Sequence, residues 1–434
     1  MQYYSTNNKS LNVSFKQAVL KGLSEDGGLF MPVSIPSLNK NFIENIESKS
    51  FQEIALEVAK GFIDGEIKES DLEKIVSEAI NFDAPVIRLS DNHFILELFH
   101  GPTLAFKDFG ARFMARTFSY FNKDNDIELI ILVATSGDTG SAVANGFYET
   151  EGIKVVILYP SGKISEIQEK QITTLDKNII AIEIDGTFDD CQKLVKSAFV
   201  DKDISERLRL SSANSINIAR LIPQSFYYIN AYKQIKKFGK KIVFCVPSGN
   251  FGNLTAGLFA REMGLNIERY IAAVNSNKVF AEYIQTGKLE PKPSIRTLSN
   301  AMDVGNPSNF SRIVDLYENN FNLVQKIIFS KSYNDEQTIS AIKEVYEKFN
   351  YVIDPHGAVG YLASKDYLEK YGKDYLIVTL ETAHPSKFID IVKSALGIEI
   401  DMPGRLKECL KKEKKSIQLS RSFDELKDFL FLVK

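Results

Sequence analysis

Hydrophobic and polar residues alternate along this chain with two different periods. In residues 42–64 and 69–80 the apolar positions recur at helical spacing, which predicts two amphipathic helices near the N-terminus. From residue 127 onward, continuous apolar runs alternate with helical patterns. Strands are predicted at 127–135, 154–160, 178–185, 241–249, 269–275 and 374–381. Buried strands separated by helices are typical of parallel sheets covered on both faces, so the pattern predicts an α/β fold.

The order of these elements divides the chain into three parts, which fits its length of 434 residues. We expect a helical N-terminal domain at 1–85, a smaller α/β domain at 86–235 and a larger α/β domain at 236–434. A proline break and a short strand at 83–89 open the second part. Helices are predicted at 216–238, where Pro223 favours a kink or break, and at 333–349 and 356–371.

Composition narrows the classes of function. The chain carries 53 Lys and Arg against 56 Asp and Glu, which disfavours general binding of nucleic-acid backbones. No apolar run is long enough to span a membrane, and the N-terminus lacks a signal-peptide pattern. Three scattered Cys and four His offer little for a disulfide framework or a metal site. We therefore expect a cytoplasmic protein without a metal.

Two glycine-rich turns follow predicted buried strands and open predicted helices. They are ATSGDTGSA at 134–142 and VPSGNFGNLTAG at 246–257. A helix N-terminus offers free backbone N–H groups, and glycine lets an anion approach them closely. Each turn is therefore a candidate anion cradle. The alternative is a tight strand-to-helix connection that binds no ligand.

A third segment, ELFHGPTLAFKDFGARFMAR at 97–116, places Lys107 among apolar residues. Apolar surroundings disfavour the charged form of a lysine and leave a nucleophilic amine. The alternative is a surface lysine whose stem lies along apolar neighbours.

The segments HGPTLAFKDFG, SGDTG and SGNFGN resemble motifs of the threonine synthase family, in its longer bacterial and fungal branch. Further matching segments occur in the family's order across nearly the whole chain: GLSEDGGLFMP at 22–32, YPSGKIS at 159–165, SANSINIARL at 212–221, LSNAMDVGNPSN at 298–309 and ETAHPSKF at 381–388. The resemblance implies a fold-type-II pyridoxal-phosphate enzyme, similar to the tryptophan synthase β subunit. Such a fold has two open, twisted α/β domains, here with a helical N-terminal region added. Part of residues 86–125 would then pack with the larger domain and carry the Schiff-base lysine.

The resemblance also implies roles for individual residues. Lys107 would form the Schiff base with pyridoxal 5'-phosphate and move protons during turnover. The other residues expected to bind the cofactor are Gly249, Asn250, Phe251, Gly252 and Asn253 at its phosphate, Thr382 at its ring nitrogen and Asp138 near its ring hydroxyl. The loop expected to receive the substrate carboxylate comprises Thr135, Ser136, Gly137, Asp138 and Thr139.

The substrate phosphate would need its own site. Candidate cations are Lys163, Arg112, Arg116 and Arg220, each with a structural ion pair or a solvated surface role as the alternative. Candidate donors are Asn214, Ser215 and Asn217, with helix capping as the alternative. His100 and His384 are candidates for orienting the lysine loop, and Cys245 is expected in the core.

The reaction implied by the resemblance converts O-phospho-L-homoserine and water to L-threonine and phosphate, by a carbon–oxygen lyase. Two alternatives remain open: a related phospho-lyase that releases a keto acid, and a non-catalytic relative that binds a metabolite. We expect a small-molecule substrate, no nucleic-acid or membrane partner, and a monomer or small homo-oligomer. Closure of the smaller domain over substrate is a further hypothesis.

Overall fold

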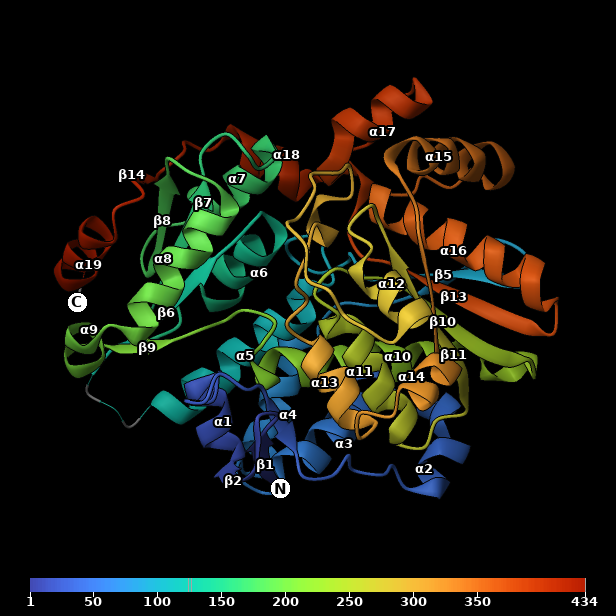
Figure 1. The fold of residues 1–434 in the computed structure, drawn as a ribbon, viewed down its shortest axis with the longest axis horizontal. Coiled ribbons are helices and arrows are strands. Elements are labelled where there is room, and N and C mark those ends of the chain that lie inside the picture. Colours follow the sequence, from blue (N-terminus) through green and yellow to red (C-terminus); the bar gives the residue numbers. More distant parts are fainter. Residues whose placement is uncertain (124, 126, 434) are drawn as a thin grey trace.

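A computed structural model describes residues 1–123, 125 and 127–433. Two α/β lobes stand side by side above an N-terminal region, with the N-terminus at the base and the C-terminal segment on the smaller lobe (Figure 1). Each lobe contains one sheet with helices on both faces. The predicted α/β architecture with two open sheets is therefore present.

The N-terminal region combines helices with a small sheet. Its helices are α1 (Phe15–Lys21), α2 (Lys40–Glu44), η1 (Ile46–Ser48), α3 (Phe51–Ile63) and α4 (Glu69–Ala79). Strands β1 (Gln2–Ser5), β2 (Asn8–Ser14) and β3 (Phe30–Pro32) form an antiparallel sheet in the order β2-β1-β3. The two predicted helices are confirmed as α3 and α4, but the sheet was not predicted. Strand β2 reads NKSLNVS, with only Val13 buried, so it carries little hydrophobic signal.

The larger sheet has six strands in the order β12-β11-β10-β13-β5-β4. They are β12 (Ile328–Ser332), β11 (Ile267–Val274), β10 (Lys241–Pro247), β13 (Tyr375–Glu381), β5 (His93–Glu97) and β4 (Val86–Arg88). All neighbours are parallel except the edge pair β4–β5. One face packs against α15 (Asp335–Phe349), α16 (Pro355–Tyr371) and α17 (Ile389–Leu396).

The other face of the larger sheet lies on a layer of largely buried helices. They are α5 (Lys107–Asn122), α10 (Ile218–Ile235) and α11 (Gly252–Glu262). Helix α10 packs against α11, α5 and α3, and nearly all its residues are buried. It continues through Pro223, so the predicted break does not occur there. The other helices within residues 236–388 are η2 (Lys236–Phe238), α12 (Val279–Thr286), η3 (Asn300–Met302), α13 (Phe310–Leu316), α14 (Phe321–Ile327) and η4 (Pro385–Phe388).

The smaller sheet has five parallel strands in the order β14-β8-β7-β6-β9. They are β14 (Ile417–Leu419), β8 (Ile179–Ile184), β7 (Ile153–Pro160), β6 (Leu129–Ala134) and β9 (Arg209–Ser211). Its helices are α6 (Asp138–Phe147), α7 (Glu166–Thr173), α8 (Phe188–Val200), α9 (Lys202–Arg207), α18 (Gly404–Lys411) and α19 (Phe423–Leu432).

The C-terminal segment crosses back from the larger lobe to the smaller one. Strand β14 pairs with β8, and Leu426 and Leu430 of α19 belong to the same hydrophobic cluster as α8. Residues 236–434 were expected in the larger domain, whereas this tail completes the smaller sheet. Likewise β4 and β5 belong to the larger sheet although they lie within 86–235. The three-residue strand β4 pairs with β5, which follows it closely in sequence, whereas the three-residue strand β14 pairs with β8, which lies far earlier in the chain.

Candidate active site

The loops that carry the sequence motifs meet where parallel strands end. Strands β5, β13 and β10 are neighbours, so the segments that follow their carboxyl ends lie at one edge of the larger sheet. The lysine loop, residues 101–107, follows β5. It is fixed to the residues after β13 by two backbone hydrogen bonds, from Phe106 N to Thr382 O (2.9 Å) and from His384 N to Leu104 O (3.0 Å). Lys107 and Thr382 are thereby held on adjacent segments.

Lys107 is the first residue of α5, and its side chain is partly buried. Its Nζ makes no hydrogen bond within residues 1–123, 125 and 127–433. Burial lowers the pKa of Lys107 to about 8; nearby Asp138 opposes this shift, while Arg220 and Lys387 add to it. The lowered pKa has the direction expected for a lysine in apolar surroundings.

The turn after β10 opens α11 with a strained backbone. Phe251 has a φ of 57° in the left-handed region, which turns the chain sharply before Gly252 begins the helix. The side chains of Asn250 and Asn253 hold the turn: Asn250 donates to Ser215 Oγ (2.6 Å), and Asn253 donates to Pro247 O (2.9 Å). The backbone N–H groups of residues 250–253 have no acceptor in the described part of the chain.

These observations test whether the turn suits a phosphate group. Four free N–H groups at a helix N-terminus provide both hydrogen-bond donors and a partial positive charge. Gln224 Oε1 and Arg220 Nε are buried without partners among the described residues; the Gln224 side chain lies near Gly252 of the turn, and Arg220 Nε lies near Gly110 of α5. A phosphate cradle here, a hydroxyl on Thr382 and a lysine amine whose pKa is lowered to about 8 together fit pyridoxal phosphate.

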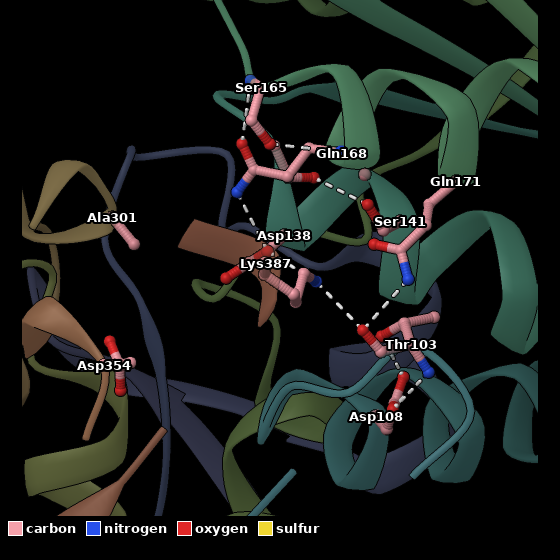
Figure 2. Close-up of polar contacts among 12 residues, drawn as sticks. Thr103, Asp108, Asp138, Ser141, Ser165, Gln168, Gln171, Ala301, Asp354 and Lys387 are labelled. Atoms are coloured by element: carbon pink, nitrogen blue, oxygen red, sulfur yellow. Dashed lines mark hydrogen bonds and ion pairs between the residues drawn. The ribbon is translucent and has the colours of Figure 1, made fainter. Parts of the chain in front are cut away.

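The SGDTG loop comes from the smaller lobe and faces the same region. Thr135 Oγ1 accepts hydrogen bonds from Gly137 N (3.0 Å) and Gly140 N (2.8 Å), which shapes the turn. Asp138 Oδ1 lies 2.7 Å from Lys387 Nζ and accepts from Gln168 Nε2 at 3.0 Å (Figure 2). Burial alone would raise the pKa of Asp138, but Lys387 and Lys107 hold it well below its usual range.

The candidate cations for the substrate phosphate have different surroundings. Arg112 donates to Ala79 O (3.1 Å) and to the Asn81 side chain (3.0 Å), so it joins α5 to the end of α4. Arg116 donates to the carbonyls of Arg112 and Gly146, which favours a structural role for this arginine too.

The other two cations differ in burial: Arg220 lies in the interior and Lys163 on the surface. Arg220 is buried and donates to Ala213 O (2.6 Å), and it is close enough to Lys107 to lower the pKa of that lysine. Lys163 is exposed on the smaller lobe and donates to Gly186 O (2.8 Å).

The candidate hydrogen-bond donors at 214–217 also make different contacts. Asn217 caps α10 and donates to Val19 O (2.9 Å), so its capping alternative holds. Ser215 contacts Asn250 in the phosphate turn. The Asn214 side chain has no hydrogen-bond partner among the described residues, whereas its backbone N donates to Ser212 Oγ (3.3 Å).

The candidate residues His100, His384 and Cys245 make contacts with neighbouring protein groups. His100 Nε2 is 2.8 Å from Glu97 Oε2. His384 Nδ1 accepts from Ser386 N at 3.1 Å, and burial lowers the pKa of His384 to about 4. Cys245 is fully buried in β10, as expected. Among the described residues, no group of His, Cys, Asp and Glu is arranged to hold a metal ion.

Sequence reasoning missed Lys387 and Gln168 as members of the site. Lys387 lies inside the ETAHPSKF motif, but the sequence alone gives no sign that this lysine is buried against Asp138. Gln168 occupies the space that a side chain at Gly137 would take. The only available signal was that Gly137 and Lys387 both stand in motifs already recognised.

Comparison with protein families agrees with this geometry. Residues 2–80 match the family described as "Threonine synthase N terminus", residues 83–382 match "Pyridoxal-phosphate dependent enzyme", and residues 357–430 match "Threonine synthase, C-terminal". The central match covers the lysine loop, the phosphate turn and Thr382. The chain is therefore a pyridoxal-phosphate-dependent enzyme of fold type II.

Individual relatives define the family more closely. The threonine synthases of Buchnera aphidicola (subsp. Acyrthosiphon pisum) and Escherichia coli K12 are each 43% identical, over 99% and 94% of both chains respectively. The crystal structure of threonine synthase from E. coli superposes with a TM-score of 0.93 at 41% identity, covering 100% of both chains. The pyridoxal-phosphate-bound threonine synthase from Brucella melitensis gives 0.92 at 34% identity, covering 99% of this chain and 98% of that one. This chain belongs to the threonine synthase family.

Proposed function

We propose that this protein converts O-phospho-L-homoserine and water to L-threonine and phosphate, with pyridoxal phosphate held between the two lobes. The observation that carries the proposal is the Lys107 amine, which has no hydrogen-bond partner among the described residues and a pKa lowered to about 8. Its loop lies at the same edge of the larger sheet as the N-terminus of α11, where backbone N–H groups are free. An amine of this kind is both a nucleophile and a base near neutral pH. The relatives named threonine synthase supply the substrate class.

Different residues of the chain would bind the cofactor, transfer protons and orient the substrate in the proposed reaction. When bound, pyridoxal phosphate supplies an electron sink for carbanion chemistry. We assign its phosphate to the N–H groups of residues 250–253 and its ring nitrogen to the Thr382 hydroxyl. Lys107 Nζ takes and returns protons at the substrate carbons, which lie within its reach only when the substrate is oriented. We assign that orientation to residues 135–139, with the backbone N–H groups of that turn at the substrate carboxylate.

The substrate phosphate requires cations within the same cleft. We propose Lys163 and Arg220 for this role, with Asn214 as a neutral donor. Lys163 is free to leave its carbonyl partner because the side chain is exposed, whereas Arg220 is already fixed in the interior. Arg112 and Arg116 are not proposed, since both donate to backbone carbonyls of the surrounding helices and Arg116 Nε also lies 3.4 Å from Glu78 Oε2.

Composition and the absence of long apolar helices in the described residues bear on the location and oligomeric state of the protein. In the described part of the chain, no helix combines the length and apolarity needed to cross a bilayer. With its near-neutral charge and its three unpaired cysteines, the protein fits a cytoplasmic enzyme that acts on a small molecule, as a monomer or a small homo-oligomer.

One assay tests the reaction against its alternatives. The purified protein is incubated with O-phospho-L-homoserine, with and without added pyridoxal phosphate, and phosphate, threonine and 2-oxobutyrate are measured together. We expect phosphate and threonine in equal amounts. Phosphate with 2-oxobutyrate would indicate the phospho-lyase alternative, and neither product would indicate a non-catalytic relative. Borohydride reduction followed by peptide mass spectrometry should place the cofactor on Lys107, and a label elsewhere would refute the assignment of that lysine.

A further inference from the structure

Lys387 joins the two lobes at the site through a single ammonium group. Its side chain is 0% exposed. The Nζ atom lies 2.7 Å from Asp138 Oδ1, in the SGDTG loop of the smaller lobe, and donates to Thr103 O at 2.9 Å, in the lysine loop of the larger lobe (Figure 2). A lysine is seldom fully buried, because removing its charge from water costs several kcal/mol even when the lysine is paired.

The contact to Thr103 continues toward the reactive lysine. Thr103 donates from its backbone N (2.8 Å) and from Oγ1 (2.6 Å) to the two carboxylate oxygens of Asp108, the residue after Lys107. Asp108 is fully buried, and burial raises its pKa, although Thr103, Lys387 and Arg112 lower it in part. Arg405 from α18 also faces this carboxylate. Lys387 therefore contacts both loops that surround the amine.

Several charged groups act on Lys107 and its neighbours. The groups that act on Lys107 from other elements are Asp138 at the start of α6, Arg220 of α10 and Lys387 of η4. Asp108, on the same helix as Lys107, is faced by Lys387, Arg112 and Arg405. Desolvation together with the nearby cations Lys387 and Arg220 therefore disfavours a proton on Lys107, and only Asp138 opposes this effect.

We propose that Lys387 is a positioning residue for the reaction assigned above. By occupying the carboxylate of Asp138, it prevents that carboxylate from pairing with Lys107 and leaves the Lys107 amine free. If Lys387 is absent, Asp138 is buried without its ion-pair partner, and Lys107 is the other cation whose charge acts on it. The inference rests on the proposed role of Lys107 as the reactive amine, and it adds a residue that the family motifs do not assign.

The test measures the protonation of Lys107 directly in the full-length chain freed of cofactor. Acetic anhydride labels neutral amines, and peptide mass spectrometry reports the labelling of Lys107 as a function of pH. For the unaltered protein the half-point should lie near pH 8. Lys387→Met should move the half-point up by about one unit or more, roughly a tenfold loss of labelling at pH 7. Asp138→Asn should move it down.

The double variant gives the decisive comparison. Lys387→Met with Asp138→Asn removes one charge of each sign and should return the half-point to within about half a unit of the unaltered protein. A purely structural role for Lys387 would not reverse in this way. Lys393→Met, which removes an exposed lysine paired with Glu399, is the matched control and should change nothing.

Each outcome bears on one claim. An unshifted half-point in Lys387→Met, or the same shift in the single and double variants, overturns the role of Lys387. If circular dichroism shows that Lys387→Met does not fold, an unchanged half-point in Asp138→Asn overturns it instead. Borohydride trapping in the unaltered protein tests Lys107 separately: trapping elsewhere overturns the proposed function, whereas trapping on Lys107 with no charge reversal overturns only this inference.

Discussion

Gly249 in the phosphate turn is the position where a single methyl group should have the clearest effect. A Cβ built on this residue lies 2.7 Å from Met302 Cα and 3.0 Å from both Met302 C and O. These are backbone atoms of η3, so no flexible side chain can give way. Gly249 does not have a positive φ, and the predicted effect of Gly249→Ala is therefore steric overlap without backbone strain.

The size of the effect follows from the overlap. Ordinary contacts begin near 3.4 Å, so the turn or η3 must move by roughly 0.7 Å. Overpacking of this kind costs about 1–3 kcal/mol of unfolding free energy. A displaced turn also loses alignment of the N–H groups at the cofactor phosphate. Loss of one or two such charge-assisted hydrogen bonds, at about 1.5 kcal/mol each, predicts a Kd for pyridoxal phosphate raised roughly 10- to 100-fold.

Gly252→Ala provides the matched control in the same turn. Its Cβ would meet Asn309, Ser215 and Gln224 at 3.5 Å or more, which is ordinary contact. Since Gly252 begins α11, alanine there should leave the cofactor-free protein as stable as before or raise its unfolding free energy by about 0.5 kcal/mol. The same methyl group stands beside the free N–H groups, so cofactor affinity should still fall.

Urea unfolding of the cofactor-free proteins and titration of cofactor absorbance measure both quantities. The expected result is a loss of stability and affinity in Gly249→Ala, and a loss of affinity alone in Gly252→Ala. If Gly249→Ala unfolds at the same urea concentration and binds the cofactor with unchanged Kd, the steric reasoning is wrong. Unchanged affinity in Gly252→Ala would show that the cradle does not hold the phosphate.

Three further changes test other parts of the site. Lys107→Ala should fold, give no borohydride-reducible adduct and lose activity by about 10³-fold or more, because one amine serves as nucleophile and base; a residual adduct would contradict this. Thr382→Val keeps the side-chain shape and should lower kcat/KM by up to roughly tenfold, the value of one hydrogen bond, whereas Thr382→Ser should recover most of it. Arg312 is fully buried and donates to Phe30 O and Ile216 O. Arg312→Met should therefore lower the unfolding free energy by on the order of 3 kcal/mol in urea denaturation, and a change below about 1 kcal/mol would refute the role.

The strands and helices of both lobes were predictable because their hydrophobic patterns are long and regular. Continuous apolar runs such as 127–135 and 241–249 correspond to β6 and β10, which are buried on both faces. The short strands β2 and β14 were not predictable. Strand β2 pairs with the neighbouring β1, whereas β14 pairs with the distant β8, and neither carries an apolar pattern that a local reading detects.

The same distinction holds for the site. Lys107 and the phosphate turn stand in segments whose residue types already indicate their chemistry, whereas the role of Thr382 was implied only by the resemblance to the family. The pairing of Asp138 with Lys387 could not be predicted, because it depends on how two lobes face one another. Arg112 and Arg116 were candidates by charge alone, and only the fold shows that backbone carbonyls use their donors. Charge identifies a candidate, whereas burial and partners decide its role.

The returning C-terminal tail has a consequence for biosynthesis. Strand β8 is translated long before β14, yet β14 pairs with its outer edge. While the ribosome translates the larger lobe, the smaller sheet has an unpaired edge strand, and the apolar surface that α19 later covers is open to water. Translation of nearly the whole chain must therefore precede completion of the smaller lobe. During that interval, the nascent enzyme is most exposed to edge-to-edge association and most dependent on chaperones.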